Sequence, residues 1–420
     1  MDNIEQIKLF EGGKLLCVQT GRFMTSRITF RFVLPLDADT VSAYAALPGL
    51  IRYTSRHYPA TLQMERKLAS LYGAGFSAVA GKAGDMQILS FTLSTIADRF
   101  AFQGDAVSEA GLRFISECIF EPDLDENGLF KSENLVREKR LMMEDIKTAF
   151  GDKMQYSLNR FNEVFYEGER AAVLSSGTVE QVESLEPAAV STAWKRMLQS
   201  AEVLVCAVGD WDAKALARSI RERFKPIQRM WKKETIQPHP AFKALKEVHE
   251  SETLEQCKLN MGFSLSGADE DAFKVMNMIF GRSEMSRLSK VVREKMGLCY
   301  YCSSSYGPKK QIIIVYSGIE PGNRQKTVEA VMEQLKAIQA GDFSDEETEI
   351  AKRKLKDAYL SSMDSPADIA GWYLPQMLTE DTAKSVHESI ENIMRVDRQR
   401  IIDCAKTVKL DCIYTLGDNA

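Results

Sequence analysis

The sequence predicts an α+β protein built of two homologous halves, each an α/β sandwich. The chain has 420 residues, too many for one hydrophobic core, so two or more domains are expected. Apolar residues make up 45% of it and charged residues 27%, the balance of a globular protein. Strand-like and helix-like stretches follow one another without the regular alternation of a doubly wound sheet, which favours the α+β class.

A repeat along the chain indicates the two halves. VLVCAVGDWD, which starts at Val203, and CIYTLG, which starts at Cys412, both read as buried strands, and their terminal glycines lie 208 residues apart. FKSENLVREKRL from Phe130 aligns with FSDEETEIAKRKL from Phe343 at an offset of 213. Two matches in the same order with nearly equal offsets predict a duplicated domain of roughly 210 residues.

The break between the halves is expected in a polar, basic stretch that ends Pro-His-Pro. This places a first domain at residues 1–224, a linker at 225–240 and a second domain at 241–420.

The first half opens with two strand-like stretches, KLLCVQT and RITFRFVLPL, rich in β-branched and aromatic residues. A helix is expected from about Thr40, and another over residues 61–73. QILSFTLSTI alternates apolar and polar residues as a half-buried strand does. A long helix is expected over residues 130–150.

The second half shows a similar succession of strands and helices. CKLNMGFSL and QIIIVYSGI read as strands, and residues 270–281 and 323–341 read as helices. SRLSKVVREKMG reads as a further helix that ends at Gly297, a natural C-terminal cap, before the chain turns into a strand.

Charge and composition exclude several partners. A net charge of -5 gives no reason to expect nucleic acid or an anionic membrane. No apolar run approaches the ~20 residues that span a bilayer, and the amino-terminal stretch lacks the apolar core of a secretory signal. Eight cysteines are scattered through strand-like stretches, which suits buried thiols in a reducing compartment. We therefore expect a cytoplasmic protein.

Residues for metal chemistry are sparse. None of the four histidines lies three to five residues from another, so no helix carries a pair of imidazoles for zinc. Glu138, Glu144 and Asp145 lie two turns apart on one expected helix. Such acids can hold a metal, act as acid and base, or face water. No phosphate-binding loop or G-x-S-x-G motif is present. No metal and no cofactor are expected.

The sequence CYYC has the spacing of a redox motif or half a zinc site. Without a second pair, two buried strand cysteines are the better interpretation. Strand alternation would put Cys299 with Tyr301 on one face and Tyr300 with Cys302 on the other.

Arg293 and Tyr300 flank the turn from helix to strand. A guanidinium and a phenol brought together there can clamp a peptide carbonyl or a developing oxyanion. From composition alone, an exposed arginine and a half-buried tyrosine are the commoner outcome.

These residues belong to a longer pattern, G-x-x-x-x-S-R-L followed by R-E-K-x-G-L-x-Y, over Gly281–Tyr300. It resembles the second-domain signature of the insulinase/pitrilysin/mitochondrial processing peptidase superfamily, the inverzincins. The resemblance implies two sandwich halves that form a clamshell. It also implies that Arg293 and Tyr300 are a substrate-binding pair.

The first half departs from the family. Peptidases of this superfamily carry H-x-x-E-H on its first helix, but the corresponding stretch here is AALPG. Ala45, Pro48 and Gly49 then stand where the ligands and the catalytic base would be, and none of them can bind zinc or take a proton. Glu138 and Asp145 match the acids of the family's later metal-site helix, and read as a remnant now bound to basic neighbours or solvated.

The resemblance therefore implies a non-catalytic subunit. It would pair with a zinc-bearing paralogue as a heterodimer, or with itself, and help to bind a peptide through Arg293 and Tyr300. The alternative is a non-enzymatic scaffold of the same fold; an active hydrolase with an unrecognised centre has little support. The chain also resembles Firmicute insulinase-like proteins that lack the zinc motif and are associated with modification of elongation factor P.

Overall fold

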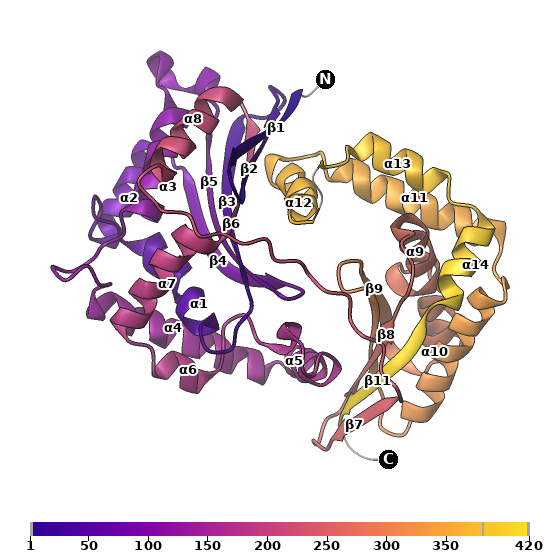
Figure 1. Ribbon diagram of the computed structural model, residues 1–420. Helices are drawn as coiled ribbons and strands as arrows, with labels where there is room; N and C mark the ends of the chain where they lie inside the picture. The colour runs from indigo at the N-terminus through magenta and orange to yellow at the C-terminus, as the bar shows by residue number, and fades with distance from the viewer. Residues whose placement is uncertain (1–2, 380–381, 418–420) are drawn as a thin grey trace. The chain divides into compact units, whose positions relative to one another are not determined.

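The computed structural model describes residues 3–379 and 382–417. The chain forms two compact units, each with one sheet covered by helices, which confirms the α+β class (Figure 1). Unit 1 comprises residues 1–148, 173–235 and 362–384, and unit 2 comprises residues 149–172, 236–361 and 385–420.

The strands of unit 1 are β1 (Asn3–Phe10), β2 (Gly13–Gln19), β3 (Thr25–Pro35), β4 (Gly75–Ala83), β5 (Met86–Ile96) and β6 (Glu202–Gly209). Its helices are α1 (Val41–Tyr53), α2 (Thr61–Ser70), α3 (Val107–Phe120), α4 (Ser132–Gly151), α6 (Val179–Glu183), α7 (Pro187–Ser200), α8 (Ala213–Phe224) and α12 (Pro366–Met377), with short 3-10 turns at Asp98–Phe100 and Phe102–Gly104.

The strands of unit 2 are β7 (Lys246–Glu250), β8 (Cys257–Ser264), β9 (Cys299–Gly307), β10 (Ile312–Ile319) and β11 (Lys409–Leu416). Its helices are α5 (Lys153–Phe165), α9 (Glu270–Asn277), α10 (Arg324–Gln339), α11 (Asp345–Ser361), α13 (Val386–Met394) and α14 (Arg398–Lys406), with a 3-10 turn at Arg170–Ala172 and π-helical turns η4 (Met278–Arg282) and η5 (Leu288–Lys295).

The two sheets have the same topology, which confirms the duplication. The order is β1-β2-β6-β3-β5-β4 in one sheet and β7-β11-β8-β10-β9 in the other. In both, a parallel pair (β2 with β6, β7 with β11) is followed by antiparallel neighbours throughout. Only β1 has no counterpart among the described strands of unit 2.

The halves exchange equivalent segments. Residues 149–172 come from the first half of the chain but belong to unit 2, where α5 packs on β8 and β11. Residues 362–384 come from the second half but belong to unit 1, where α12 packs on β3 and β6. The exchanged segments begin 213 residues apart, the offset of the sequence repeat. From the sequence we expected continuous domains at 1–224 and 241–420, joined by a linker at 225–240. That division contains no exchanged segments and so differs from the two units of the structure.

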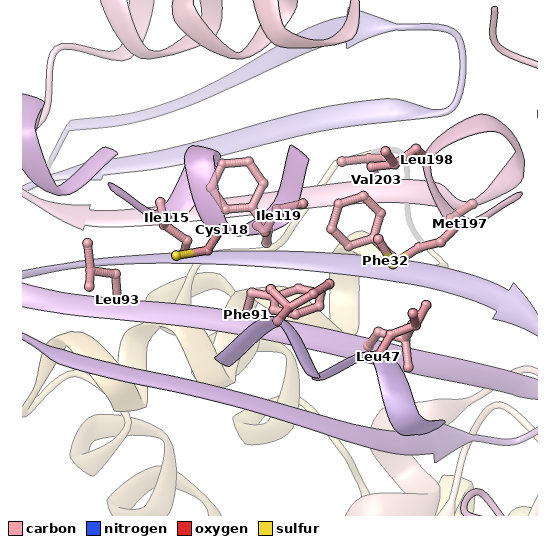
Figure 2. Packing of buried hydrophobic residues seen from close by; sticks show 14 of the residues in the cluster. Phe32, Leu47, Phe91, Leu93, Ile115, Cys118, Ile119, Met197, Leu198 and Val203 are labelled. Carbon is pink, nitrogen blue, oxygen red and sulfur yellow. The ribbon is translucent and has the colours of Figure 1, made fainter. Parts of the chain in front are cut away.

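The core of unit 1 lies between one face of its sheet and the helices α1, α3 and α7. Figure 2 shows side chains from these elements interleaved with those of β3, β5 and β6. Phe32 and Phe91, which are fully buried, meet edge to face with ring centroids 5.9 Å apart. This packing fixes α1, the helix on which the metal ligands of the resembled peptidases would lie.

The end of η5, close to Arg293 and Tyr300 in the chain, is marked by a glycine, as the sequence predicted. Gly297 takes a left-handed φ of +63° just after Met296, the residue that caps η5, which confirms the predicted end of the helix. The expected helix is π-helical over Leu288–Lys295, a difference that periodicity does not reveal. Among the described residues, no helix combines the length and the apolar character needed to cross a bilayer.

Candidate functional site

The first candidate site lies where α1 meets α4. Ala45, Pro48 and Gly49 lie on α1, a helix that is buried along most of its length between the sheet and α7. Pro48 stands inside this helix and has no N–H for the helical hydrogen-bond ladder. Apolar and small residues thus occupy the positions of the expected ligands.

Glu138 of α4 reaches α1 at Gly49. A Cβ atom on residue 49 would lie 2.0 Å from Oε1, 2.1 Å from Cδ and 2.2 Å from Oε2 of Glu138. No side chain fits there while the carboxyl group remains, because real Cβ atoms do not approach other heavy atoms so closely. Glycine at this position is therefore what admits the carboxyl group.

The Glu138 carboxyl group is buried. The residue is 7% exposed, and Oε2 has no hydrogen-bond partner among the described residues. Burial raises the pKa of Glu138 to about 7, the charge of Arg137 opposes the rise, and that of Asp145 adds to it. We expected Glu138 to be solvated or bound to a basic residue. The structure differs, because the carboxyl group is packed against Gly49, away from solvent, and no basic side chain of the described residues binds it.

The other acids of α4 face outward. Asp145 is exposed and acts on Glu138 only through its charge. Glu144 accepts a hydrogen bond of 2.8 Å from Arg140, one turn away. Over residues 3–379 and 382–417, no three His, Cys, Asp or Glu side chains gather in a way that could hold a metal ion.

The second candidate site is Arg293 and Tyr300, at the turn from η5 to β9. Arg293, whose side chain is 37% exposed, donates to Glu294 at 2.6 Å. Tyr300 is 58% exposed and donates to Glu320 at 3.3 Å, and the charge of Glu320 raises the pKa of the phenol. Within the described part of the chain, each therefore has its own carboxylate partner and no hydrogen bond joins the two.

A β-bulge explains the exposure of Tyr300. On β10, Ile319 pairs with Cys299 and Gly318 pairs with Tyr301, so Tyr300 is the extra residue of β9. The bulge turns Tyr300 outward. From Tyr301 onward, the side chains of β9 therefore point to the faces opposite to those expected from simple strand alternation.

As a result of the bulge, Cys299 and Cys302 share one face. Both are buried, as predicted, but the prediction that they face opposite sides is wrong. The neighbouring Cys302 thiol is the main reason that the pKa of Cys299 falls to about 7, and Ser317 and the charge of Arg293 also lower it. The Cys299 thiol in turn raises the pKa of Cys302. A one-residue irregularity leaves no mark in strand periodicity, so sequence reasoning missed this pair.

Comparisons with known proteins show which proteins this chain is similar to. The protein family described as "Peptidase M16 inactive domain" matches residues 184–355. The chain is 28% identical over 428 residues to "Probable inactive metalloprotease YmfF" of Bacillus subtilis (strain 168), covering 99% of this chain and 98% of that protein. It is 23% identical to "Uncharacterized zinc protease YmxG" of the same organism, over 76% of this chain and 77% of that one. Its fold matches the crystal structure of a conserved protein from Enterococcus faecalis V583 with a TM-score of 0.90, 27% identity and 99% coverage of both chains.

Proposed function

Because this chain is a homologue of the M16 metallopeptidases, the insulinase and processing-peptidase family, and lacks their metal-binding motif, we propose that it is a non-catalytic subunit. It pairs with a zinc-bearing paralogue and helps to hold that enzyme's peptide substrate through Arg293 and Tyr300. The proposal has three parts: inactivity, peptide binding and pairing.

The contact between Gly49 and Glu138 is the observation that carries the proposal. A hydrolytic zinc site needs imidazole or carboxylate ligands around an open position for water. Here the carboxyl group of α4 lies against the helix backbone at the place of a ligand side chain, which leaves no room for one. The chain's own residues at this site neither hold a metal nor activate water.

The surroundings of Arg293 and Tyr300 support peptide binding. The bulge turns the Tyr300 side chain toward solvent, and Arg293 lies in the last turn of η5, seven residues earlier in the chain. Their contacts to Glu294 and Glu320 are surface interactions, which contribute little and are readily exchanged for a peptide carbonyl or carboxylate. A guanidinium fork and a phenol are suitable donors to such groups.

Pairing is supported by the relatives. The same Bacillus strain has one relative described as an inactive metalloprotease and one described as a zinc protease. Arg293 and Tyr300 can assist peptide hydrolysis only if another subunit carries the zinc site. A heterodimer with a zinc-bearing paralogue is therefore favoured over a homodimer. All eight cysteines are free and buried, and we place the complex in the cytoplasm, where thiols stay reduced.

The test is affinity purification of the tagged chain from its native cells, followed by mass spectrometry and elemental analysis. We expect a paralogue with H-x-x-E-H to copurify, with zinc in proportion to the paralogue and not to this chain. Recovery of the chain alone, or only with itself, would contradict the pairing. Recovery with non-peptidase proteins would favour the scaffold function, and enzymes that modify elongation factor P among them would tie it to that pathway.

A further inference from the structure

The unit 1 sheet presents two arginines on the face opposite its main core. On β3, Ile28, Phe30 and Phe32 point into the helix-covered core, so Arg27 and Arg31 point to the other face. The hydrogen bond of 3.0 Å between Thr29 and Thr92 lies between them on that same face. Helix α12 packs on β6 and β3 there.

These arginines are half-buried and poorly satisfied. Arg27 donates from Nη1 to the Ser94 hydroxyl at 3.2 Å, but its Nε is buried without a partner. Nε of Arg31 is also buried and unpartnered. Among the described residues, neither arginine has a carboxylate within ion-pair distance. Burial lowers the pKa of both, and the charge of Arg27 lowers that of Arg31 further.

Some other half-buried arginines in this chain have carboxylate partners, whereas Arg137 of α4 also has buried nitrogens, Nε and Nη2, without a hydrogen-bond partner among the described residues. Arg287 forms a two-pronged contact with Glu347, at 2.8 and 3.3 Å, and Arg400 forms one with Asp269, at 2.8 Å for both prongs. A cation removed from water without such a partner costs free energy, so an unpaired one calls for an explanation. The nearby acid that acts on Arg27 is Asp368 of α12, which does so through its charge alone and has Ser365 as its hydrogen-bond donor.

The spacing of Arg27 and Arg31 indicates what kind of ligand could pair with them. Arg27 and Arg31 are four residues apart on an extended strand, roughly 13 Å. Two forks at that spacing suit two carboxylates about four residues apart on an extended peptide. Two cations on a chain of net charge -5 do not suit a nucleic acid, which is held through many phosphates.

The surface around the arginines suits an extended chain. Across β5, the residues that pair with Arg27, Thr29 and Arg31 are Ser94, Thr92 and Ser90. On the edge strand β4, the next residues in these rows are Gly75, Ser77 and Val79, all exposed or nearly so. Hydroxyl groups and small side chains leave room for a peptide backbone beside the guanidinium groups.

We propose that Arg27 and Arg31 form a recognition site for acidic side chains of an extended peptide. This deepens the proposed function, on which it rests for the peptide as ligand, by assigning the substrate an acidic character. It also explains why two half-buried cations are kept without carboxylate partners in the fold.

The test compares two fluorescent peptides that differ only in charge. One carries two glutamates about four residues apart, and the other carries glutamine at both places. We expect the full chain to bind the glutamate peptide at least about tenfold more tightly by fluorescence anisotropy. Arg27→Gln and Arg31→Gln should each reduce this ratio, and together they should bring it close to one. Arg113→Gln, which removes an exposed charge on α3, should leave it unchanged.

The outcomes separate the two claims. Equal binding of both peptides by the wild-type chain, or no binding of the glutamate peptide, would overturn the acidic preference. If Arg293→Ala weakens both peptides equally while the ratio is one, the proposed function survives and this inference fails. If the ratio depends on Arg27 and Arg31 while Arg293→Ala has no effect, this inference survives and the role of Arg293 fails. Displacement of the glutamate peptide by millimolar inorganic phosphate as readily as by free glutamate peptide would show a general anion site and overturn it.

Discussion

Gly49 of α1 and Glu138 of α4 are in direct contact, so closely that a Cβ atom on residue 49 would lie 2.0 Å from the glutamate oxygen. The resemblance drawn from the sequence would align both residues with metal-site positions of the zinc-bearing peptidases. In this chain the absence of a side chain at Gly49 leaves room for the Glu138 carboxyl group, which is buried against α1.

The contact predicts that Gly49→Ala destabilises the fold. The methyl group must displace the Glu138 carboxyl group, and we expect a loss of about 1–3 kcal/mol in the free energy of unfolding by urea denaturation. Glu138→Ala in the same chain should relieve most of that loss, which a double-mutant cycle measures. Gly371→Ala is the control, since a Cβ there meets nothing within 4 Å of this helical glycine. It should stabilise by roughly 0.5–1 kcal/mol. Equal effects at both glycines would contradict the contact.

The burial of Glu138 predicts a pH-dependent stability. Burial raises the pKa from 4.5 to about 7, so the folded chain holds this proton more tightly than the unfolded chain. Stability should fall as pH rises from about 4.5 to 7 and then level off, by up to about 3 kcal/mol from this group.

Glu138→Gln should remove that contribution. The variant should match wild type below about pH 4.5 and be more stable above pH 7. Glu144→Gln, on the same helix but exposed and paired with Arg140, should change little across the range. Loss of stability in Glu138→Gln at pH 8 would show that the carboxylate has a partner after all.

The paired thiols predict unequal cysteine reactivity. The pKa of Cys299 is lowered to about 7, whereas burial raises that of Cys118, Cys206 and Cys412. Alkylation by iodoacetamide, followed residue by residue with mass spectrometry, should therefore label Cys299 first, with a rate that rises through about pH 7. Cys302→Ala removes the neighbouring thiol that lowers the pKa of Cys299 and should shift this rise toward higher pH. An unchanged profile in that variant would contradict the pairing.

Much of the fold could be predicted from the sequence because the evidence for it is local. The repeated strand and helix stretches indicated two equal halves, and the matched order of the two sheets confirms them. The exchange of α5 and α12 could not be predicted, because it depends on which sheet a helix packs against rather than on its own periodicity.

The candidate site likewise has features that the sequence predicted and features that it did not. The resemblance placed Gly49 and Glu138 at related positions, and they are in contact. The shared face of Cys299 and Cys302 was missed, because the bulge at Tyr300 depends on pairing with β10. The arginines of RITFRFVLPL carried a signal that was available: two charged residues four apart in an otherwise buried strand.

The most direct test of the central claim is peptide processing by a reconstituted complex of this chain and a zinc-bearing paralogue from the same genome. Arg293→Ala with Tyr300→Ala should leave folding and assembly intact, since both side chains are exposed or half-buried at the surface. We expect kcat/KM to fall about a hundredfold or more if the pair stabilises an oxyanion, and the loss to lie in KM if it only positions the peptide. Lys295→Ala, at the end of the same helix, should process normally. Normal processing by the double variant in an assembled complex would contradict the account.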